Sequence, residues 1–359
     1  MKNKILTILF STLLAIILIF NIFTKKETIS YTERRKLKEL PEITLETIFN
    51  GDIFDNLEDY YSDHFILRDK FRNLKANFGF KVLGKKDYNN LYIKDNYIYK
   101  IEYPLKENKV QGFTNKINKL YNDYLKDMNA YYSIIPDKNY YTQNDYLKLD
   151  YDRLFKLLQE NLSSDIKYID ITKDLNIDNY YYTDIHWKQE TLNNVVKRLS
   201  ETMKFNVTNN YTKKEYKPFY GTYYGQLGLN TLPDKLIYLS NDTINNSSVK
   251  AIGKEVNKVY DENSLGKMDS YDVFLGGTVP IIEVTNNNTQ NNKELIIFRD
   301  SFSSSIAPLL LDGYKKVTLI DLRYIDSSLL TNYISFTNQD ILLLYNTTII
   351  NNSDLIKID

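Results

Sequence analysis

Short apolar runs alternate with amphipathic segments from about residue 111 to the end of the chain. Five of these runs are bounded by polar or turn-forming residues, which predicts buried β-strands at 130–135, 166–171, 294–298, 316–321 and 340–345. Apolar residues at helical spacing predict helices at 113–129, 151–162, 188–203 and 304–313. Strands that alternate with helices are typical of a parallel sheet covered by helices on both faces. We therefore expect an α/β domain in which all five strands share one sheet.

The N-terminus carries a different pattern, an uncharged apolar run over residues 5–23. A run of this length is about enough to cross the hydrocarbon core of a bilayer. The alternative is a cleaved signal peptide, but the run exceeds the usual apolar core of such a peptide and no A-x-A-like site follows it. Lys2 and Lys4 favour a cytoplasmic N-terminus. We predict a retained single-pass anchor over residues 1–26 in a bacterial cell membrane, with the rest of the chain outside the cytoplasm.

In the segment of residues 27–105, which follows the anchor, residues 27–60 are polar and charged and predict a linker with short helices. Apolar positions among charges predict a helix that begins near Leu67, and apolar–polar alternation around a central "KDN" predicts a hairpin over 91–101. We expect this extracytoplasmic segment to pack on a main domain of residues 106–359. Within that domain, the Asn-rich stretch from about 205 to 280 is expected to be an irregular insertion.

Composition narrows the classes of function. The 46 basic and 46 acidic residues balance, so no global positive field points to nucleic acid as a partner. The chain has no cysteine, which excludes disulfides, thiolate metal sites and a cysteine nucleophile. Two histidines are too few for a histidine-rich metal site. We therefore expect neither a metal nor another cofactor.

Ser301 stands where the predicted strand 294–298 turns into the predicted helix 304–313. The carboxyl edge of an open α/β sheet is where ligands bind, and the start of a helix offers free backbone N–H groups to an oxyanion. The G-x-S-x-G motif of α/β-hydrolases is absent. Ser301 is thus a candidate nucleophile, and an ordinary serine at a helix N-terminus is the alternative.

The segment "TDIHW" at residues 183–187 contains one of the two histidines and the single tryptophan. A serine becomes a good nucleophile when a histidine takes its proton and a carboxylate fixes the tautomer of that histidine. On a loop, Asp184 and His186 can meet, and Trp187 can shield one side and lower the local dielectric. In the alternative interpretation, Thr183 or Asp184 caps a helix and Trp187 belongs to the core.

Several ordered motifs resemble the DHHW family, which is related to the alginate O-acetyltransferases AlgX and AlgJ. The resemblance covers nearly all of the chain after the anchor. The segments that match the family in order are "YYSDHFILRDKF", "IIPDKNYY", "YYTDIHW", "FYGTYYG", "YDVFLGGTVPIIEV", "IIFRDSFSSSIAPLL" and "VTLIDLRY". Two positions depart from the family pattern: Ile185 replaces the first histidine of D-H-H-W, and Thr278 stands where asparagine is frequent.

The resemblance implies a three-layer fold similar to SGNH hydrolases, which is flavodoxin-like, with the D-x-H element upstream of the serine. Carried over by position, the nucleophile is Ser301, the base is His186 and the orienting acid is Asp184. Because Thr278 replaces the asparagine, the backbone N–H groups of Gly277 and Ser301 are the candidate oxyanion donors. His64 lies in the early motif, where the family also has glutamine, and we interpret it as structural.

The family resemblance also implies a function. The protein is expected to transfer an acyl group, with acetyl as the first candidate, to a cell-envelope polysaccharide. It implies a membrane-bound O-acyltransferase as the partner that supplies the acyl group. Candidate substrate-binding residues are Tyr220 in the Tyr-rich loop, Trp187, and Arg323, for which a structural ion pair is the alternative. Two other functions stay open: ester hydrolysis or D-alanyl transfer to teichoic acid by the same triad, and a non-catalytic scaffold in an export or modification complex.

Overall fold

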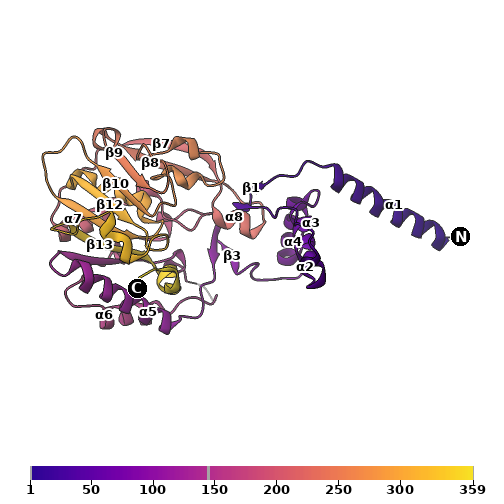
Figure 1. Ribbon diagram of the computed structural model, residues 1–359, viewed down its shortest axis with the longest axis horizontal. Helices are drawn as coiled ribbons and strands as arrows, with labels where there is room; N and C mark the ends of the chain where they lie inside the picture. The colour runs from indigo at the N-terminus through magenta and orange to yellow at the C-terminus, as the bar shows by residue number, and fades with distance from the viewer. Residues whose placement is uncertain (1, 144–145, 359) are drawn as a thin grey trace. The chain divides into compact units, whose positions relative to one another are not determined.

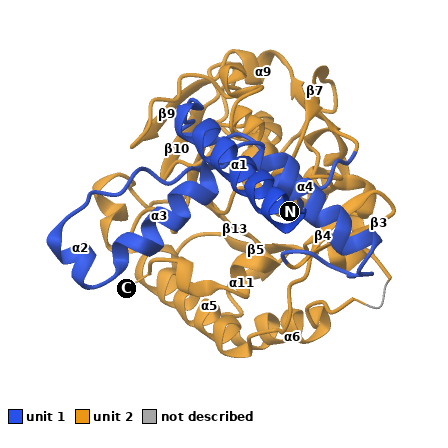
Figure 2. Ribbon diagram, turned by 90° about the vertical axis from the view of Figure 1, so that its right-hand side faces the viewer, with its two compact units in different colours: residues 1–89, 224–231 blue, residues 90–223, 232–359 orange. Residues whose placement is uncertain are grey.

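The structure of the protein is a computed structural model that describes residues 2–143 and 146–358. The chain forms two compact units, shown in Figure 2. Unit 1 comprises residues 1–89 and 224–231, and unit 2 comprises residues 90–223 and 232–359. The candidate triad residues all lie in unit 2.

Unit 2 is built around a seven-stranded, mostly parallel sheet. Across the sheet, the strands follow the order β6 (Lys167–Tyr168), β5 (Ala130–Ile135), β13 (Asp340–Asn346), β11 (Glu294–Arg299), β12 (Lys316–Ile320), β10 (Ile281–Thr285) and β9 (Ser248–Ile252). The first five pair in parallel, so the prediction of one parallel sheet from the five apolar runs is confirmed. The last two strands, β10 and β9, extend the sheet with antiparallel pairing, which the sequence patterns did not predict.

Both faces of the sheet are covered. Successive residues of a strand point to opposite faces, and the residues of the central strand β11 are buried on both. Leu295 and Ile297 of β11 belong to one buried cluster, and Ile296 and Phe298 belong to another. Helix α7 (Asn193–Met203) contributes to the first cluster, and α5 (Glu107–Leu120) and α6 (Tyr151–Asn161) contribute to the second. Figure 1 shows α5 and α6 next to each other on one side of the sheet. The result is a layered α/β domain with the sheet between two helical layers.

Two of the predicted helices change their geometry along their length. Helix α5 gives way to a π-helix at Tyr121–Leu125. After α10 (Ser303–Ile306), the chain continues as a 3-10 helix over Ala307–Gly313. Pro308 lies at the start of this second segment, and because proline has no backbone N–H, it cannot donate the hydrogen bond of a continuing α-helix.

Two hairpins complete unit 2. Strands β3 (Leu91–Lys94) and β4 (Tyr97–Lys100) pair as the sequence predicts, and Asp95 and Asn96 between them adopt the positive φ angles of a tight turn. The second hairpin lies inside the stretch 205–280. It consists of β7 (Thr212–Phe219) and β8 (Asp234–Ser240), and α8 (Thr222–Leu227) and α9 (Asp242–Asn245) lie nearby in the sequence.

Unit 1 begins with α1 (Lys2–Phe23), which is long and apolar enough to cross a membrane. A signal sequence has the same character, and α1 is the one such helix among the residues described. The remaining elements of this unit are short: β1 (Ile29–Ser30), β2 (Arg35–Lys36), α2 (Leu45–Phe49), α3 (Asp52–Asp63) and α4 (Arg68–Lys81). His64 fits the structural interpretation, because its ring stacks on Tyr60 and its two nitrogens meet the carbonyls of Tyr60 and Glu27.

Ion pairs hold the short elements of unit 1 together. Arg35 of β2 forms two hydrogen bonds with the Asp63 carboxylate at the end of α3. Hydrogen bonding to Arg35 lowers the pKa of Asp63 to about 2. Glu33 accepts a hydrogen bond from Arg68 at 2.5 Å and pairs with Arg72 at 3.2 Å. These contacts tie α3 and α4 to the segment that follows the apolar helix.

Candidate active site

Ser301 lies in the turn that joins the central strand β11 to α10. Its neighbour Asp300 is 1% exposed and holds this turn in place. One oxygen of Asp300 accepts a hydrogen bond from the Phe302 N–H at 3.0 Å, and the other accepts one from the Asn346 N–H at 2.6 Å. Because Asn346 ends the adjacent strand β13, these bonds fix Ser301 at the carboxyl edge of the sheet.

The "TDIHW" segment forms the end of a loop whose two sides are paired. Tyr180 and Trp187 form an antiparallel bridge, and the Tyr181 N–H donates to the His186 carbonyl at 3.2 Å. The Trp187 indole N–H donates to the Phe302 carbonyl at 3.0 Å and to Ser305 Oγ at 2.9 Å. The tryptophan therefore connects the histidine loop to the helix that follows Ser301.

This environment corrects the interpretation of Trp187 as a substrate-binding residue. Its side chain is 0% exposed, and its only polar atom is used in the bonds to Phe302 and Ser305. A ligand in the solvent does not reach such a side chain. The alternative, in which Trp187 belongs to the core, fits the structure.

Asp184, His186 and Ser301 form one continuous hydrogen-bonded chain. Asp184 Oδ1 lies 2.6 Å from His186 Nδ1, and His186 Nε2 lies 2.8 Å from Ser301 Oγ, although serine and histidine are 115 residues apart in the sequence. Both distances are within the range expected for a nucleophile, its base and the group that orients the base. Asp184 and His186 are buried, and Ser301 is partly exposed. The arrangement can therefore present a hydroxyl to a ligand while its proton acceptor stays shielded from water.

The segment that precedes and begins α8 orients the Asp184 carboxylate. Asp184 Oδ2 accepts a hydrogen bond from the Thr222 N–H at 2.7 Å, while Oδ1 accepts one from the His186 N–H at 3.0 Å. Gly221 lies against the backbone of Asp184, and its N–H donates to Thr183 Oγ1 at 2.8 Å. A Cβ atom at Gly221 would lie 2.2 Å from Asp184 Cβ, so only glycine fits at this position.

We expect Gly221→Ala to impair the site because its methyl group must displace Asp184. The substitution should destabilise the fold by about 1–3 kcal/mol, the usual cost of overpacking, and should lower activity by more than about tenfold through the displaced carboxylate. Gly112→Ala is the matched control. Gly112 lies in helix α5, and a Cβ there would lie 3.4 Å from its nearest neighbour, Ser353 Oγ, which is an ordinary contact distance. Melting temperature and turnover of an activated ester would be measured for both variants. Equal behaviour of the two would contradict the steric argument.

Asp234 and Lys138 form hydrogen bonds with the residues that precede Asp184, at positions 181–183. The Asp234 carboxylate accepts hydrogen bonds from the Tyr182 N–H at 2.8 Å, the Thr183 N–H at 2.7 Å and the Thr183 hydroxyl at 2.6 Å. Lys138, which is 2% exposed, donates to the Tyr181 carbonyl at 2.8 Å. Burial lowers the pKa of Lys138 to about 7, against the opposing effect of Asp234 and Asp184. Lys138, which belongs to the "PDK" motif, thus helps to fix the triad loop, the loop that carries Asp184 and His186.

Aromatic rings enclose the histidine. The Tyr271 ring stacks on His186 with 3.9 Å between ring centroids and 6° between planes, and Phe302 lies 4.8 Å from it. The Tyr271 hydroxyl donates to Ser305 Oγ at 2.9 Å, which holds its ring in place. Stacking against a fixed ring restricts rotation of the imidazole and shields one of its faces from water.

The two predicted oxyanion donors differ in their surroundings. The Ser301 N–H has no hydrogen-bond partner among the described residues, so it is available to a ligand. The Gly277 N–H donates to the Phe274 carbonyl at 3.3 Å in a local turn. Gly277 has a φ of 77°, and a Cβ there would lie 1.9 Å from an Asp272 oxygen. Gly277 therefore serves the turn, and its N–H is not a free donor in this structure.

The other predicted substrate-binding residues are Arg323 and Tyr220. Arg323 donates two hydrogen bonds to the Asp321 carboxylate, at 2.8 and 2.6 Å, which fits the structural ion pair rather than substrate binding. Tyr220 is 39% exposed and adjoins Gly221 in the segment that orients Asp184. Its ring is accessible to a ligand, and its role in substrate binding stays a prediction.

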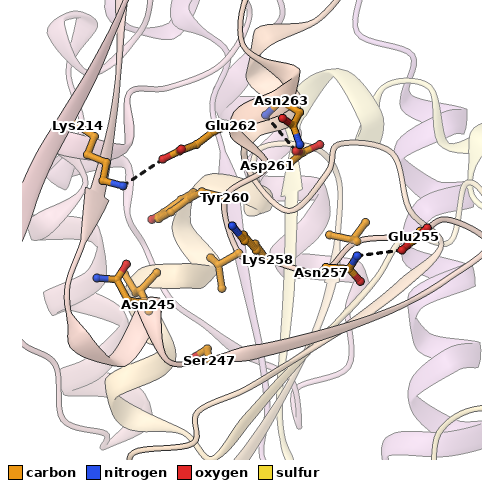
Figure 3. Close-up of a pocket in the computed structure, with 13 residues that line it drawn as sticks. Lys214, Asn245, Ser247, Glu255, Asn257, Lys258, Tyr260, Asp261, Glu262 and Asn263 are labelled. Atoms are coloured by element: carbon orange, nitrogen blue, oxygen red, sulfur yellow. Dashed lines mark hydrogen bonds and ion pairs between the residues drawn. The ribbon is translucent and has the colours of Figure 1, made fainter.

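A cavity of about 810 Å³ lies elsewhere in unit 2 (Figure 3), and none of the triad residues lines it. Its polar lining is partly self-paired: Lys214 pairs with Glu262 at 3.1 Å, and Asn257 donates to Glu255 at 3.0 Å. No group of three or more His, Cys, Asp or Glu residues suited to a metal ion occurs within residues 2–143 and 146–358. The hydrogen-bonded triad, in contrast to this cavity, combines a nucleophile, a base and an orienting acid.

We expect stability to depend on pH through Glu190, close to the triad loop. Burial raises the pKa of Glu190 to about 7, and one of its oxygens has no hydrogen-bond partner among the described residues. The folded state then binds this proton more tightly than the unfolded state, so stability falls as pH rises from about 4.5 to about 7. Glu190→Gln should remove this loss and be more stable above pH 7, by about 3 kcal/mol at most.

Thermal unfolding of wild type and Glu190→Gln between pH 4.5 and 8 tests this expectation. Lys138 titrates in both proteins, so the difference between the two curves isolates Glu190. If the unfolding temperatures of the two proteins change with pH in parallel over the whole range, Glu190 is ionised in the folded protein and the expectation is wrong.

Four residues that support the triad were not among the candidates predicted from the sequence. Gly221 and Thr222 lie in the quoted "FYGTYYG" segment, so the motif was a signal, although only its tyrosines were interpreted. Tyr271 begins the quoted "YDVFLGG" segment. Asp234 lies outside every quoted motif, and its contacts with Tyr182 and Thr183 cross 51 or more residues, so no local pattern points to it.

Comparison with solved structures gives relatives of the fold. A DHHW family protein from Eubacterium siraeum DSM 15702 is similar with a TM-score of 0.63 and 17% identity, over 75% of this chain and 94% of that chain. Bacillus cereus PatB1 is similar with a TM-score of 0.59 and 19% identity, over 72% of this chain and 96% of that chain. PatB1 with a sulfonyl adduct has a TM-score of 0.56 and 18% identity, over 72% and 97% of the respective chains.

The O-acetyltransferase domain of Pseudomonas putida AlgJ also aligns, with a TM-score of 0.46 and 9% identity, over 73% of this chain and 92% of that chain. No protein-family model and no curated protein matches the sequence. The resemblance predicted from the sequence motifs is confirmed at the level of the fold: this chain has the fold of the DHHW family protein and of PatB1.

Proposed function

We propose that the protein is an extracytoplasmic serine acyltransferase of SGNH-hydrolase-like fold, held at the bacterial membrane by α1, that O-acetylates a cell-envelope polysaccharide. One observation carries the proposal: the hydrogen-bonded chain of Asp184, His186 and Ser301 at the carboxyl edge of the sheet. The order of roles along that chain is acid, base and nucleophile. The choice of acetyl transfer draws on the resemblance of the motifs to the DHHW family.

In the first half-reaction, Ser301 Oγ attacks the acyl carbonyl of the donor. His186 Nε2 accepts the serine proton as the new ester bond forms, and Asp184 stabilises the resulting imidazolium through Nδ1. The negative charge on the carbonyl oxygen is stabilised by backbone donors, for which the Ser301 N–H is the candidate. His186 then returns the proton to the leaving group of the donor as the donor bond breaks. The products are an acyl-Ser301 enzyme and the protonated leaving group.

In the second half-reaction, a sugar hydroxyl of the polymer replaces the leaving group. His186 removes the hydroxyl proton as the sugar oxygen attacks the acyl-serine carbonyl, and the proton returns to Ser301 Oγ when the serine ester breaks. An acetyl group offers little apolar surface for recognition, so the acceptor groove must supply the specificity. Tyr220 is the candidate ring on which a sugar face packs, because it is exposed and adjoins the segment bonded to Asp184.

The acyl group has to come from inside the cell if the triad lies outside it. We propose a membrane-bound O-acyltransferase as the partner that carries the acyl group across the membrane. Deletion of the gene for such a partner should then abolish envelope acetylation as completely as Ser301→Ala does. Acetylation that continues without the partner would contradict this donor route.

A comparison of turnover with and without acceptor separates transfer from hydrolysis. The purified full-length protein would be given an activated acetyl ester, and acetate release and acceptor acetylation would be measured with and without envelope oligosaccharides. A transferase should release acetate slowly in water and turn over faster with its acceptor. Brisk hydrolysis that no acceptor accelerates would favour an esterase. Use of a D-alanyl ester with teichoic acid, but of no acetyl ester, would favour D-alanyl transfer.

A further inference from the structure

Helix α4 presents its apolar side to the outside and its polar side to the protein. Leu67, just before the helix, and Phe71, Leu74 and Phe78 within it are 55%, 52%, 62% and 51% exposed, respectively. Their spacing of four, three and four residues places them in one stripe along the helix. A helix on the surface of a soluble protein has the opposite arrangement, with the apolar stripe against the core. The exposed stripe of α4 therefore points to a second body that covers it.

The inward side of α4 consists of small residues that are buried and polar residues that form hydrogen bonds within unit 1. Ala76 and Gly79 are buried. Arg72 donates to the Gly225 carbonyl at 2.7 Å, and Asn73 donates to the Gly228 carbonyl at 3.1 Å. These contacts fix the rotation of the helix about its axis. The apolar stripe consequently cannot turn inward without the loss of these bonds.

The stripe begins next to the end of the apolar helix α1. The Ile66 N–H donates to Asn21 Oδ1 at 2.9 Å, and Asn21 lies in the last turn of α1. Lys26, which follows α1, donates to the His64 carbonyl at 3.4 Å. If α1 spans the bilayer, these bonds hold the first residue of the stripe, Leu67, at the bilayer surface.

A groove between α3 and α4 has the chemistry of a phospholipid site. Its volume is about 480 Å³, and Tyr61, Phe65 and Phe71 form its apolar walls. Arg68, Arg72 and Lys75 line the same groove, together with Ser62 and one acidic residue, Glu58. The two arginines pair with Glu33, whereas Lys75 makes no ion pair among the described residues and lies over the Tyr88 ring, 5.9 Å from its centroid. Lys70 and Lys81 are also exposed on α4 and add positive charge beside the stripe. Cationic side chains beside apolar ones match an anionic headgroup above acyl chains.

We propose that α4 is an interfacial helix that lies on the outer surface of the bilayer, with its stripe of Leu67, Phe71, Leu74 and Phe78 among the acyl chains of anionic phospholipids. This inference rests on the membrane anchoring contained in the proposed function. It assigns unit 1 a second attachment to the membrane, which limits the motion of the chain after α1 and fixes the height of this unit above the bilayer.

Tryptophan fluorescence in vesicles tests the proposal. The native Trp187 is buried and gives a constant background. The full-length Phe71→Trp protein would be reconstituted into phosphatidylcholine vesicles with and without phosphatidylglycerol, and flotation would confirm that α1 is inserted. Brominated acyl chains should quench at least about half of the added emission in Phe71→Trp, more strongly with phosphatidylglycerol, and should leave wild type unchanged. Adding Leu74→Glu should reduce this quenching severalfold while the protein still floats with the vesicles.

Three results would overturn the proposal, and each has a different meaning. Water-like, unquenched emission from floating protein would show that the stripe faces solvent. Blue-shifted emission that brominated lipid does not quench would show that another protein covers it, either a second copy or the acyl-donating partner. Protein that does not float with the vesicles would contradict the anchor itself. None of these readouts depends on acyl transfer, so the catalytic part of the proposed function is tested separately.

Discussion

Ser301→Ala should abolish acyl transfer and leave a correctly folded protein. The substitution removes the atom that forms the acyl-enzyme, so the expected loss in kcat is on the order of 10⁴-fold or more. The fold should lose only about 1 kcal/mol, because a partly exposed hydroxyl contributes one hydrogen bond, to His186. Acetylation of an acceptor oligosaccharide and thermal unfolding of the same preparation would measure the two effects.

Ser303→Ala is the matched control for this experiment. Ser303 lies two residues further along the chain, at the first position of α10, and its hydroxyl is buried without a hydrogen-bond partner among the described residues. It should retain near-normal activity. If Ser301→Ala and wild type acetylate every acceptor and the cell envelope equally well, the triad has no catalytic role and the scaffold interpretation remains.

Asp184→Asn should be almost as damaging as the loss of the serine, for a different reason. The amide keeps the shape of the carboxylate, but it neither stabilises the imidazolium nor requires a proton on His186 Nδ1. The imidazole can then carry its proton on Nε2, where it no longer accepts the proton of Ser301. We expect a loss in kcat on the order of 10³- to 10⁴-fold, with a smaller change in KM.

Asp178→Asn, at an exposed aspartate earlier in the same region, is the control for the loss of one carboxylate. Its kcat should remain within about twofold of wild type, as expected for a surface substitution away from the site. An Asp184→Asn variant that keeps more than a tenth of wild-type kcat would contradict the role of Asp184 as the orienting acid.

The five parallel strands could be predicted because each is a continuous apolar run, as expected for strands buried on both faces. Strand β9 could not, because its residues "SVKAI" are partly exposed and form no such run at the sheet edge. The hairpin β7–β8 was also missed, since five of the eight residues in β7 are charged or polar and it is largely exposed. Local apolar patterns thus predicted the five parallel strands but missed the exposed strands β7 and β9, and they also missed β10, which is largely buried between β12 and β9.

The triad could be predicted from the order of motifs, because the turn after β11 and the loop before α7 were both recognisable in the sequence. The orientation of its members could not. Gly221 and Asp234 act on the triad loop through contacts across 38 and 51 residues, and such pairings leave no periodic signal in one sequence. Trp187 and Arg323 are candidates for substrate binding in the sequence because Trp187 adjoins His186 and Arg323 follows a predicted strand at the same edge of the sheet. Burial and ion pairing decide their roles, and both depend on the tertiary structure.

Covalent labelling tests most directly the central claim, that His186 and Asp184 make Ser301 a nucleophile. A reagent that reacts covalently with activated serine hydroxyls, such as a sulfonyl fluoride, is a suitable probe. After incubation of the full-length protein with this reagent, intact mass and peptide mapping should show one adduct, located on Ser301. The adduct should be absent in Ser301→Ala and should form at least about a hundredfold more slowly in Asp184→Asn. No adduct in wild type, or the same adduct in Ser301→Ala, would contradict the account.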